Sequence, residues 1–219
     1  MNQGTPTNKD ICDFATLPAA GDARMFNEIF DIYTAAIPPS EQKNRTELMR
    51  MSRQANYVFH VAKGDNGVLA FGIVYGTKAQ DISLLEYFAT SPAFRNRGIG
   101  GCLLDHIFTA HARHPVLIEV EAPPLIPSAD NLEARRIAFY QRHGARVVDG
   151  FSYILPLKTN GTPPPMTIMI GAAEDLTSVS PETLRLWLGD VYENVYGVDR
   201  RSPEFQAMFT EPKTAFALR

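Results

Sequence analysis

The segment DISLLEYFATSPAFRNRGIGGCLLDHIFTAH, residues 81–111, determines the fold that we predict for the whole chain. Its first part, from Ile82 to Phe88, has the dense apolar and aromatic content of a buried strand. Ser91-Pro92 then ends the strand. From Ile99 to Ala110 the apolar residues recur at helical spacing. The sequence therefore predicts a strand, a glycine-rich turn and an amphipathic helix in direct succession.

The turn at residues 95–101, Arg-Asn-Arg-Gly-Ile-Gly-Gly, has the composition of an anion-binding site. A helix N-terminus carries unpaired backbone N–H groups and a positive dipole end, and glycines let an anion approach the backbone closely. Arg95 and Arg97 add positive charge. The turn therefore predicts a phosphate or pyrophosphate site. The alternative is a tight turn whose glycines serve close packing and whose arginines are solvated, because short glycine motifs also arise by chance.

The motif differs from the two common nucleotide-binding patterns. It lacks the lysine of a P-loop and the third glycine of a dinucleotide fold. Arg95, Gly98 and Gly100 instead resemble the acyl-CoA signature R/Q-x-x-G-x-G/A of the GNAT superfamily of N-acetyltransferases. The resemblance implies that successive amides of this loop hold the CoA pyrophosphate, while the preceding strand pairs its backbone with the pantetheine arm. The residues implied to bind the cofactor are Phe88, Ala89, Thr90, Arg95, Asn96, Arg97, Gly98, Ile99, Gly100 and Gly101.

Length and composition predict an ordinary globular protein. The chain has 219 residues, 45% of them hydrophobic and 21% charged, with a net charge of −3. We expect one domain over residues 1–219, with a core at about 11–171 and a C-terminal helical extension at about 172–219. There is no basic stripe for nucleic acid, no apolar run that could span a membrane and no signal peptide, so we expect a cytoplasmic location. Cys12 and Cys102 form no metal or redox motif, and no metal is expected.

The remaining pattern predicts an α/β (α+β) fold with a mixed, mostly antiparallel sheet flanked by helices. A helix crosses between the strands at 81–90 and 116–121, so these two should run parallel. The GNAT resemblance implies that this pair splays apart at the CoA site. The other expected strands are 11–17, 57–62, 68–75, 145–148 and 166–171. The other expected helices are a first helix from Asp22, a second capped by Ser40 that contains Glu41, Leu48 and Met51, a third at 129–143 ended by Gly144, and one from Ser180-Pro181.

Tyr140 is our candidate for the general acid. The sequence RRIAFYQRHG resembles the last conserved block of the family, which often places a tyrosine at this point of the helix. A phenol is neutral at pH 7 and can donate a proton to a departing thiolate. At two positions where the family commonly has Asn and Ala, this chain has Glu133 and Arg136. The alternative is that Tyr140 only packs.

Three carboxylates interrupt otherwise apolar strands, namely Glu86, Glu119 and Glu121. Carboxylates at such positions are costly to bury unless they are paired, so they either line a polar cleft or form ion pairs. We expect Glu86, which shares strand parity with Phe88 and Thr90, to act as base directly or through water. We expect Glu119 and Glu121 to project from one face and to attract a cationic amine.

Three aromatic residues complete the candidate acceptor site. The resemblance implies that the first helices lie beside the acceptor, which makes Tyr33 a candidate contact. The proline-containing excursion at 149–165 could form a wall of the acceptor pocket with Phe151 and Tyr153 inside, because long loops are often functional. Its alternative is a surface excursion.

The leading interpretation is an N-acetyltransferase that moves an acetyl group from acetyl-CoA to a primary amine of a small molecule or peptide, by direct transfer in a ternary complex. One rival is a non-catalytic acyl-CoA-binding or dimerisation module of the same fold, and another is a transferase of a longer acyl-CoA. The apolar stripe of the helix after Ser180 must be covered by this domain or by a second subunit, so a homodimer is one expected arrangement.

Overall fold

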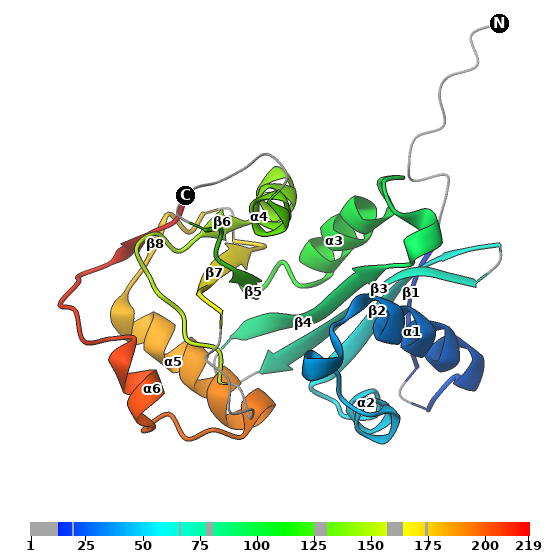
Figure 1. The fold of residues 1–219 in the computed structure, drawn as a ribbon, viewed down its shortest axis with the longest axis horizontal. Coiled ribbons are helices and arrows are strands. Elements are labelled where there is room, and N and C mark those ends of the chain that lie inside the picture. Colours follow the sequence, from blue (N-terminus) through cyan, green and yellow to red (C-terminus); the bar gives the residue numbers. More distant parts are fainter. Residues whose placement is uncertain are drawn as a thin grey trace, which may run out of the picture. The chain divides into compact units, whose positions relative to one another are not determined.

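The structure is a computed structural model that describes residues 13–18, 20–65, 67–77, 81–124, 131–156, 164–173 and 175–219. Its contacts divide the chain into two compact units (Figure 1). The first comprises Met1–Gly76 and Leu85–Ala110, and the second comprises Thr77–Leu84 and His111–Arg219. The single domain expected over the whole chain stays a prediction, because a division by contacts does not measure cooperative folding.

Seven strands hydrogen-bond in one sheet. Their order is β1 (Asp13–Thr16), β2 (Tyr57–Gly64), β3 (Gly67–Thr77), β4 (Ile82–Thr90), β5 (Val116–Glu121), β7 (Met166–Gly171) and β6 (Arg146–Val147). The register pairs Ser83 with Val116 and Leu84 with Leu117 in parallel, which confirms the expected parallel pair. The neighbouring pairs β1–β2, β2–β3, β5–β7 and β6–β7 are antiparallel. The mixed α/β fold is thus confirmed.

The first unit contains four strands and three α-helices among its described residues. They are β1 (Asp13–Thr16), α1 (Ala23–Ala36), α2 (Arg45–Met51), β2 (Tyr57–Gly64), β3 (Gly67–Thr77), β4 (Ile82–Thr90), which the two units share, and α3 (Ile99–Ala110), with short 3₁₀ turns at Pro39–Glu41 and Pro92–Phe94. The side chain of Asp22 caps α1 by accepting the N–H of Met25 at 3.0 Å.

The start of α2 differs from the prediction. Ser40 lies in the 3₁₀ turn at Pro39–Glu41, so the expected cap at Ser40 was wrong. Asn44 caps α2 instead: its side chain accepts the N–H of Glu47 at 3.0 Å, and the Glu47 side chain accepts the N–H of Asn44 at 3.1 Å. This reciprocal pair satisfies two backbone donors at once, which Ser40 could not do from inside another turn.

Both faces of the first unit's strands are covered by helices (Figure 1). Alternation along β2 and β3 sends Phe59, Val61 and Phe71 to the cluster formed with α1 and α2. The opposite face carries Gly72, where an added Cβ would lie 2.5 Å from Ile107 of α3. Glycine at position 72 therefore lets α3 pack close to the sheet.

Alternation breaks within β4. Leu85 and Phe88 both lie beside Gly72, whereas the adjacent residues Glu86 and Tyr87 both contact the ammonium of Lys43, at 2.6 and 3.2 Å. Two consecutive side chains on one face indicate a bulge-like irregularity, because a regular strand would place them on opposite faces. The predicted shared parity of Glu86 and Phe88 was therefore wrong.

The second unit contains the remaining elements. They are β5 (Val116–Glu121), α4 (Leu132–Arg142), β6 (Arg146–Val147), β7 (Met166–Gly171), β8 (Ser178–Val179), α5 (Pro181–Val191), a π-helical turn (Tyr192–Tyr196), α6 (Pro203–Ala207) and β9 (Phe216–Ala217). Asn131 caps α4 by accepting the N–H of Ala134 at 2.7 Å, and Gly144 follows the helix at φ +85°. The glycine stop is thus confirmed, while the expected start at 129 lies outside the described residues.

The C-terminal extension contains strands as well as helices, since β8 pairs antiparallel with β9. Ser180 caps α5 and Pro181 occupies its first turn, as predicted. The stripe residues Leu184, Leu188 and Val191 are buried within this single chain, so those positions need no second subunit to cover them.

Candidate functional site

The loop before α3 has the backbone geometry expected of an anion site. Asn96 and Gly98 adopt positive φ values of 60° and 77°, and the Gly98 carbonyl accepts the N–H of Cys102 at 3.1 Å as the helix begins. The left-handed conformation at position 98 explains the glycine there. Non-glycine residues with positive φ, such as Asn96, are concentrated at functional sites. Ile99 is buried and anchors the helix start.

The same loop presents its polar groups outward. Residues 95–98 are exposed, and the guanidinium of Arg97 lies 5.3 Å from the centroid of the Phe94 ring. N–H groups in the first turn of α3 have no acceptor four residues earlier, so they remain available to an oxyanion. In the strand before the loop, Ala89 belongs to the buried core cluster, and Phe88 and Thr90 are half-buried.

Glu86 forms an ion pair, one of the two alternatives expected for it, with a partner that the sequence did not identify. Its side chain is 4% exposed, and its Oε1 lies 2.6 Å from the ammonium of Lys43. Its Oε2 has no hydrogen-bond partner among the described residues. Lys43 also lies over the Tyr87 ring and donates to the Tyr87 hydroxyl, which itself donates to the Glu41 carbonyl at 3.1 Å. No local pattern could have identified Lys43, because it is 43 residues from Glu86.

Two tyrosines lie beside the Lys43–Glu86 ion pair. Tyr33 is fully buried, and its hydroxyl accepts a hydrogen bond from the backbone N–H of Lys43 at 2.7 Å. These contacts are those of a core residue. Burial raises the pKa of Tyr33 above its usual value. Burial and then the nearby Glu86 carboxylate raise the pKa of Tyr57 in the same way. Both phenols therefore stay neutral at physiological pH.

In the second unit, Tyr140 lies in α4 with its ring 5.3 Å from that of Phe139. Burial raises the pKa of Tyr140 to about 12, although the charge of Arg136 opposes part of the effect. A phenol with this pKa keeps its proton at neutral pH and can act as a donor.

Glu119 of β5 accepts hydrogen bonds from two tyrosine hydroxyls. The Tyr153 hydroxyl donates to its Oε1, and the Tyr196 hydroxyl donates to its Oε2 at 2.5 Å. The structure thus brings together the predicted residues Glu119 and Tyr153. Tyr196, from the π-helical turn, was missed because the motifs used for prediction end before the C-terminal extension. Glu121 lies 3.8 Å from the guanidinium of Arg136.

Phe151 differs from Tyr153 in its surroundings, although both are buried. Its ring packs at 5.4 Å from Phe209 and 5.2 Å from Phe216, so its contacts are apolar. Residues 157–163 of the predicted excursion lie outside the described part of the chain.

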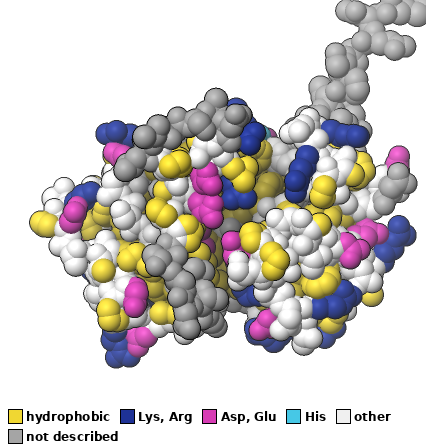
Figure 2. All heavy atoms as spheres, viewed as in Figure 1, with side chains coloured by type: hydrophobic (Ala, Val, Ile, Leu, Met, Phe, Trp, Pro, Cys, Tyr) yellow, Lys and Arg dark blue, Asp and Glu magenta, His cyan; other side chains and the backbone are white. Residues whose placement is uncertain are grey.

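The surface carries charges of both signs. On the face seen in Figure 2, Lys and Arg side chains are interspersed with Asp and Glu. Among the described residues, no helix is long and apolar enough to cross a membrane.

Comparison with known proteins agrees with this geometry. Residues 55–144, which include the loop before α3 and Tyr140, match the family described as acetyltransferase (GNAT) domain. No curated protein sequence matches the chain.

Three solved structures of acetyltransferases are similar to this chain. A putative GNAT-family acetyltransferase from Bacteroides thetaiotaomicron is 25% identical, with a TM-score of 0.68, and the match covers 85% of this chain and 99% of that one. The ribosomal-protein-S18-alanine N-acetyltransferase from Escherichia coli is 17% identical, with a TM-score of 0.55 and coverages of 73% and 92%.

The third is an aminoglycoside 6′-N-acetyltransferase complexed with coenzyme A, which is 14% identical, with a TM-score of 0.57 and coverages of 72% and 95%. At identities this low the last two structures support the fold alone. Residues 55–144 therefore form an acetyltransferase (GNAT) domain, and the fold with its parallel β4–β5 pair is similar to that of the Bacteroides structure.

Proposed function

We propose that the protein transfers an acetyl group from acetyl-CoA to a primary amine by direct transfer in a ternary complex. The observation that carries this proposal is the exposed loop of residues 95–98, whose positive-φ residues lead into the free N-terminus of α3. This geometry suits the CoA pyrophosphate. Similar solved structures include acetyltransferases of a ribosomal-protein alanine and of an aminoglycoside, which supports a small or peptidyl amine as acceptor.

The chemistry requires two proton transfers besides attack of the amine nitrogen on the thioester carbonyl. As the C–S bond breaks, Tyr140 donates a proton to the CoA thiolate, since its high pKa keeps it protonated until that step. Glu86 takes the proton lost by the amine, directly or through a water, at its unpartnered Oε2. Its Oε1 stays with Lys43, which holds the carboxylate in place.

The acceptor carries a cationic group that Glu119 and Glu121 attract. Both side chains are partly exposed on β5, so they can reach a ligand without full burial. Cationic amines would have their ammonium stabilised by these carboxylates, and the attacking amine must then lose its proton to a base.

A screen tests this function. Purified protein is incubated with acetyl-CoA and a panel of primary amines, and release of thiol is followed in parallel with a Gly100→Asp variant that we expect not to bind CoA. Thiol release above that control supports acetyl transfer. CoA binding by calorimetry without turnover on any amine would favour the non-catalytic module, and turnover with butyryl-CoA but not acetyl-CoA would favour the longer acyl donor.

A further inference from the structure

The two carboxylate oxygens of Glu119 are held by phenols from two different segments. Tyr153 donates to Oε1 from the segment before β7, and Tyr196 donates to Oε2 from the C-terminal extension. Hydrogen bonds to an ionised carboxylate are short and strong, and one on each oxygen fixes both the position and the rotation of the group. The orientation of Glu119 therefore depends on a segment that lies outside the matched acetyltransferase domain at 55–144.

Tyr196 is the last residue of a π-helical turn. This turn continues α5 over Tyr192–Tyr196 and ends at Gly197, which has a φ of 66°. A π-turn shifts the following side chains around the helix axis relative to an α-helix, and such turns are frequent at functional sites. The turn thus determines the direction in which the Tyr196 phenol points.

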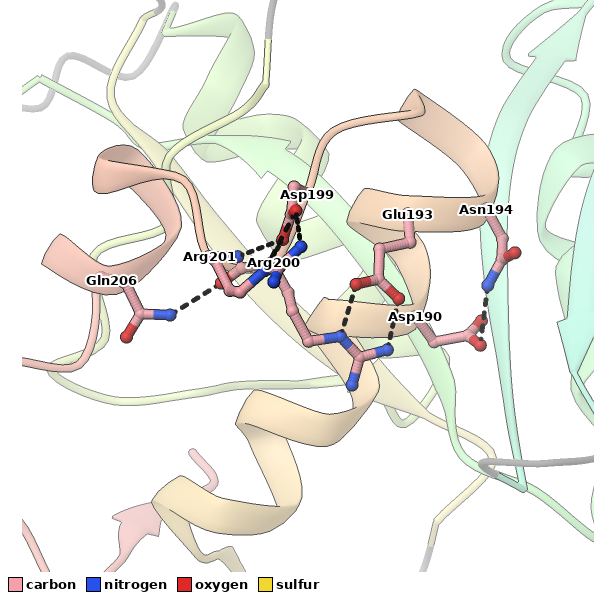
Figure 3. A network of polar contacts seen from close by, with 7 residues as sticks. All are labelled: Asp190, Glu193, Asn194, Asp199, Arg200, Arg201 and Gln206. Carbon is pink, nitrogen blue, oxygen red and sulfur yellow. Dashed lines mark hydrogen bonds and ion pairs between the residues drawn. The ribbon is translucent and has the colours of Figure 1, made fainter.

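A polar network fixes this turn to the segment that follows it (Figure 3). Arg200 reaches back to Glu193 with two hydrogen bonds, from Nε at 2.7 Å and from Nη2 at 2.5 Å. Asn194 donates to the buried Asp190 at 3.0 Å, and Gln206 donates to the Arg200 carbonyl at 2.7 Å. Because Glu193 and Asn194 belong to the turn itself, these contacts hold it in one conformation.

The apolar side of the turn is equally well held. Tyr192 is fully buried, with its ring 4.9 Å from Phe205 and 6.3 Å from Tyr153. The Val198 N–H closes the turn on the Tyr192 carbonyl at 2.8 Å. The Tyr196 hydroxyl is therefore presented to Glu119 from a supported position and not from a loosely attached tail.

The Tyr153 phenol is a neutral donor to Glu119, whose carboxylate lies partly in solvent. Burial and the Glu119 charge raise the pKa of Tyr153 well above its usual value, so this phenol stays a neutral donor. Glu119 is half-buried, so a ligand can approach its carboxylate from solvent.

We propose that Tyr196 is a specificity-determining positioning residue, which orients the Glu119 carboxylate to accept the ammonium group of a cationic amine. The inference rests on the proposed acetyl transfer and adds to it a role for the C-terminal extension. Tyr196 acts through Glu119 and touches no reacting atom. Its loss should therefore weaken binding of cationic acceptors while it leaves the chemical step and the cofactor unaffected.

The test uses 1,4-diaminobutane as the cationic probe and aniline as the neutral primary amine. Binding of 1,4-diaminobutane to the full chain saturated with CoA is measured by calorimetry, and KM and kcat for acetylation of both amines are measured by thiol release. Loss of a hydrogen bond to a charged group predicts that Tyr196→Phe raises the Kd and KM for 1,4-diaminobutane about tenfold. The KM for aniline, the kcat and the affinity for CoA should stay near the parent values.

Two further variants show whether the effect passes through Glu119. In a Glu119→Gln background, adding Tyr196→Phe should cause no further loss, because the two changes remove one shared interaction. Tyr192→Phe is the matched control: it removes a phenol from the same turn, but that hydroxyl donates to the Ile154 carbonyl and not to Glu119. It should leave the Kd for 1,4-diaminobutane near the parent value, and thermal melting verifies that each variant is folded.

Four results would overturn the inference. They are an unchanged Kd in folded Tyr196→Phe, an equal loss in the Glu119→Gln background, an equal rise of KM for both amines, and a parent protein that does not bind 1,4-diaminobutane. Each of them is distinct from failure of the proposed function, which would show as absence of thiol release with every amine of the panel.

Discussion

At the scale of single residues, the ion pair between Lys43 and Glu86 is central. Glu86 is almost completely buried, whereas Lys43 is 27% exposed, so the lysine connects a buried charge to the surface. Removing the cation that pairs with a buried carboxylate strongly destabilises the folded state. The carboxylate must then either stay charged without a partner or take up a proton.

We therefore expect Lys43→Met to lower the free energy of unfolding by about 3 kcal/mol. Urea denaturation at pH 7 measures the change. Lys43→Arg is the control, since it keeps the positive charge and should cost much less. Adding Glu86→Gln to Lys43→Met should restore part of the loss, because no charge is then left unpaired. A Lys43→Met protein as stable as the parent would show that the pair contributes nothing.

Tyr140 gives a second prediction at this scale. Tyr140→Phe removes only the hydroxyl, so turnover on a working amine should fall by about 10²-fold or more, while calorimetry finds CoA affinity nearly unchanged. Because burial raises the pKa of Tyr140 to about 12, its titration should produce no falling limb in the pH–rate profile below about pH 11. Turnover at the parent level would identify Tyr140 as a packing residue.

At the scale of elements, the start of α3 should bind the cofactor through its backbone. Gly100→Asp adds both bulk and negative charge beside the first-turn N–H groups, so we expect the affinity for CoA to fall by at least 10²-fold, measured by calorimetry. Thr109→Asp is the matched control, because it adds the same charge at an exposed position in the last turn of the same helix. Equal CoA affinity in folded Gly100→Asp and the control would refute this placement.

At the scale of the whole molecule, five tyrosines have pKa values above their usual range, with burial as the first cause of each. They are Tyr33, Tyr57, Tyr140, Tyr153 and Tyr192. The folded protein keeps these protons above pH 10, where the unfolded chain begins to release them. The folded state then binds more protons, and stability falls as pH rises.

We therefore predict that the free energy of unfolding begins to fall near pH 10. Between pH 7 and 9 these five phenols should not change it. Each such phenol contributes a slope of up to about 1.4 kcal/mol per pH unit. Urea denaturation at pH 8, 9, 10 and 10.5 measures the slope, and absorbance at 295 nm follows phenol ionisation independently. Ionisation of all eight tyrosines near pH 10 in protein that is still folded would contradict the prediction.

Several features of the fold were predictable because their signals are local. The turn at 95–101 combines glycine at a positive-φ position with the start of an apolar helical repeat, and Ser180-Pro181 combines a cap with a favoured first residue. The helix between β4 and β5 required those strands to run parallel, whatever the rest of the chain does. Each of these statements depends on residues close together in the sequence.

The tertiary structure alone decided which distant side chains meet. Lys43 donates a hydrogen bond to Glu86, 43 residues away in the sequence, and Tyr196 donates one to Glu119, 77 residues away. The irregularity in β4 turns Glu86 to the same face as Tyr87, and β7 takes the place between β5 and β6. Such contacts follow from strand register, bulges and the packing of whole elements, so no periodicity in the sequence records them. The partners of Glu86 and Glu119 became evident only in the folded chain.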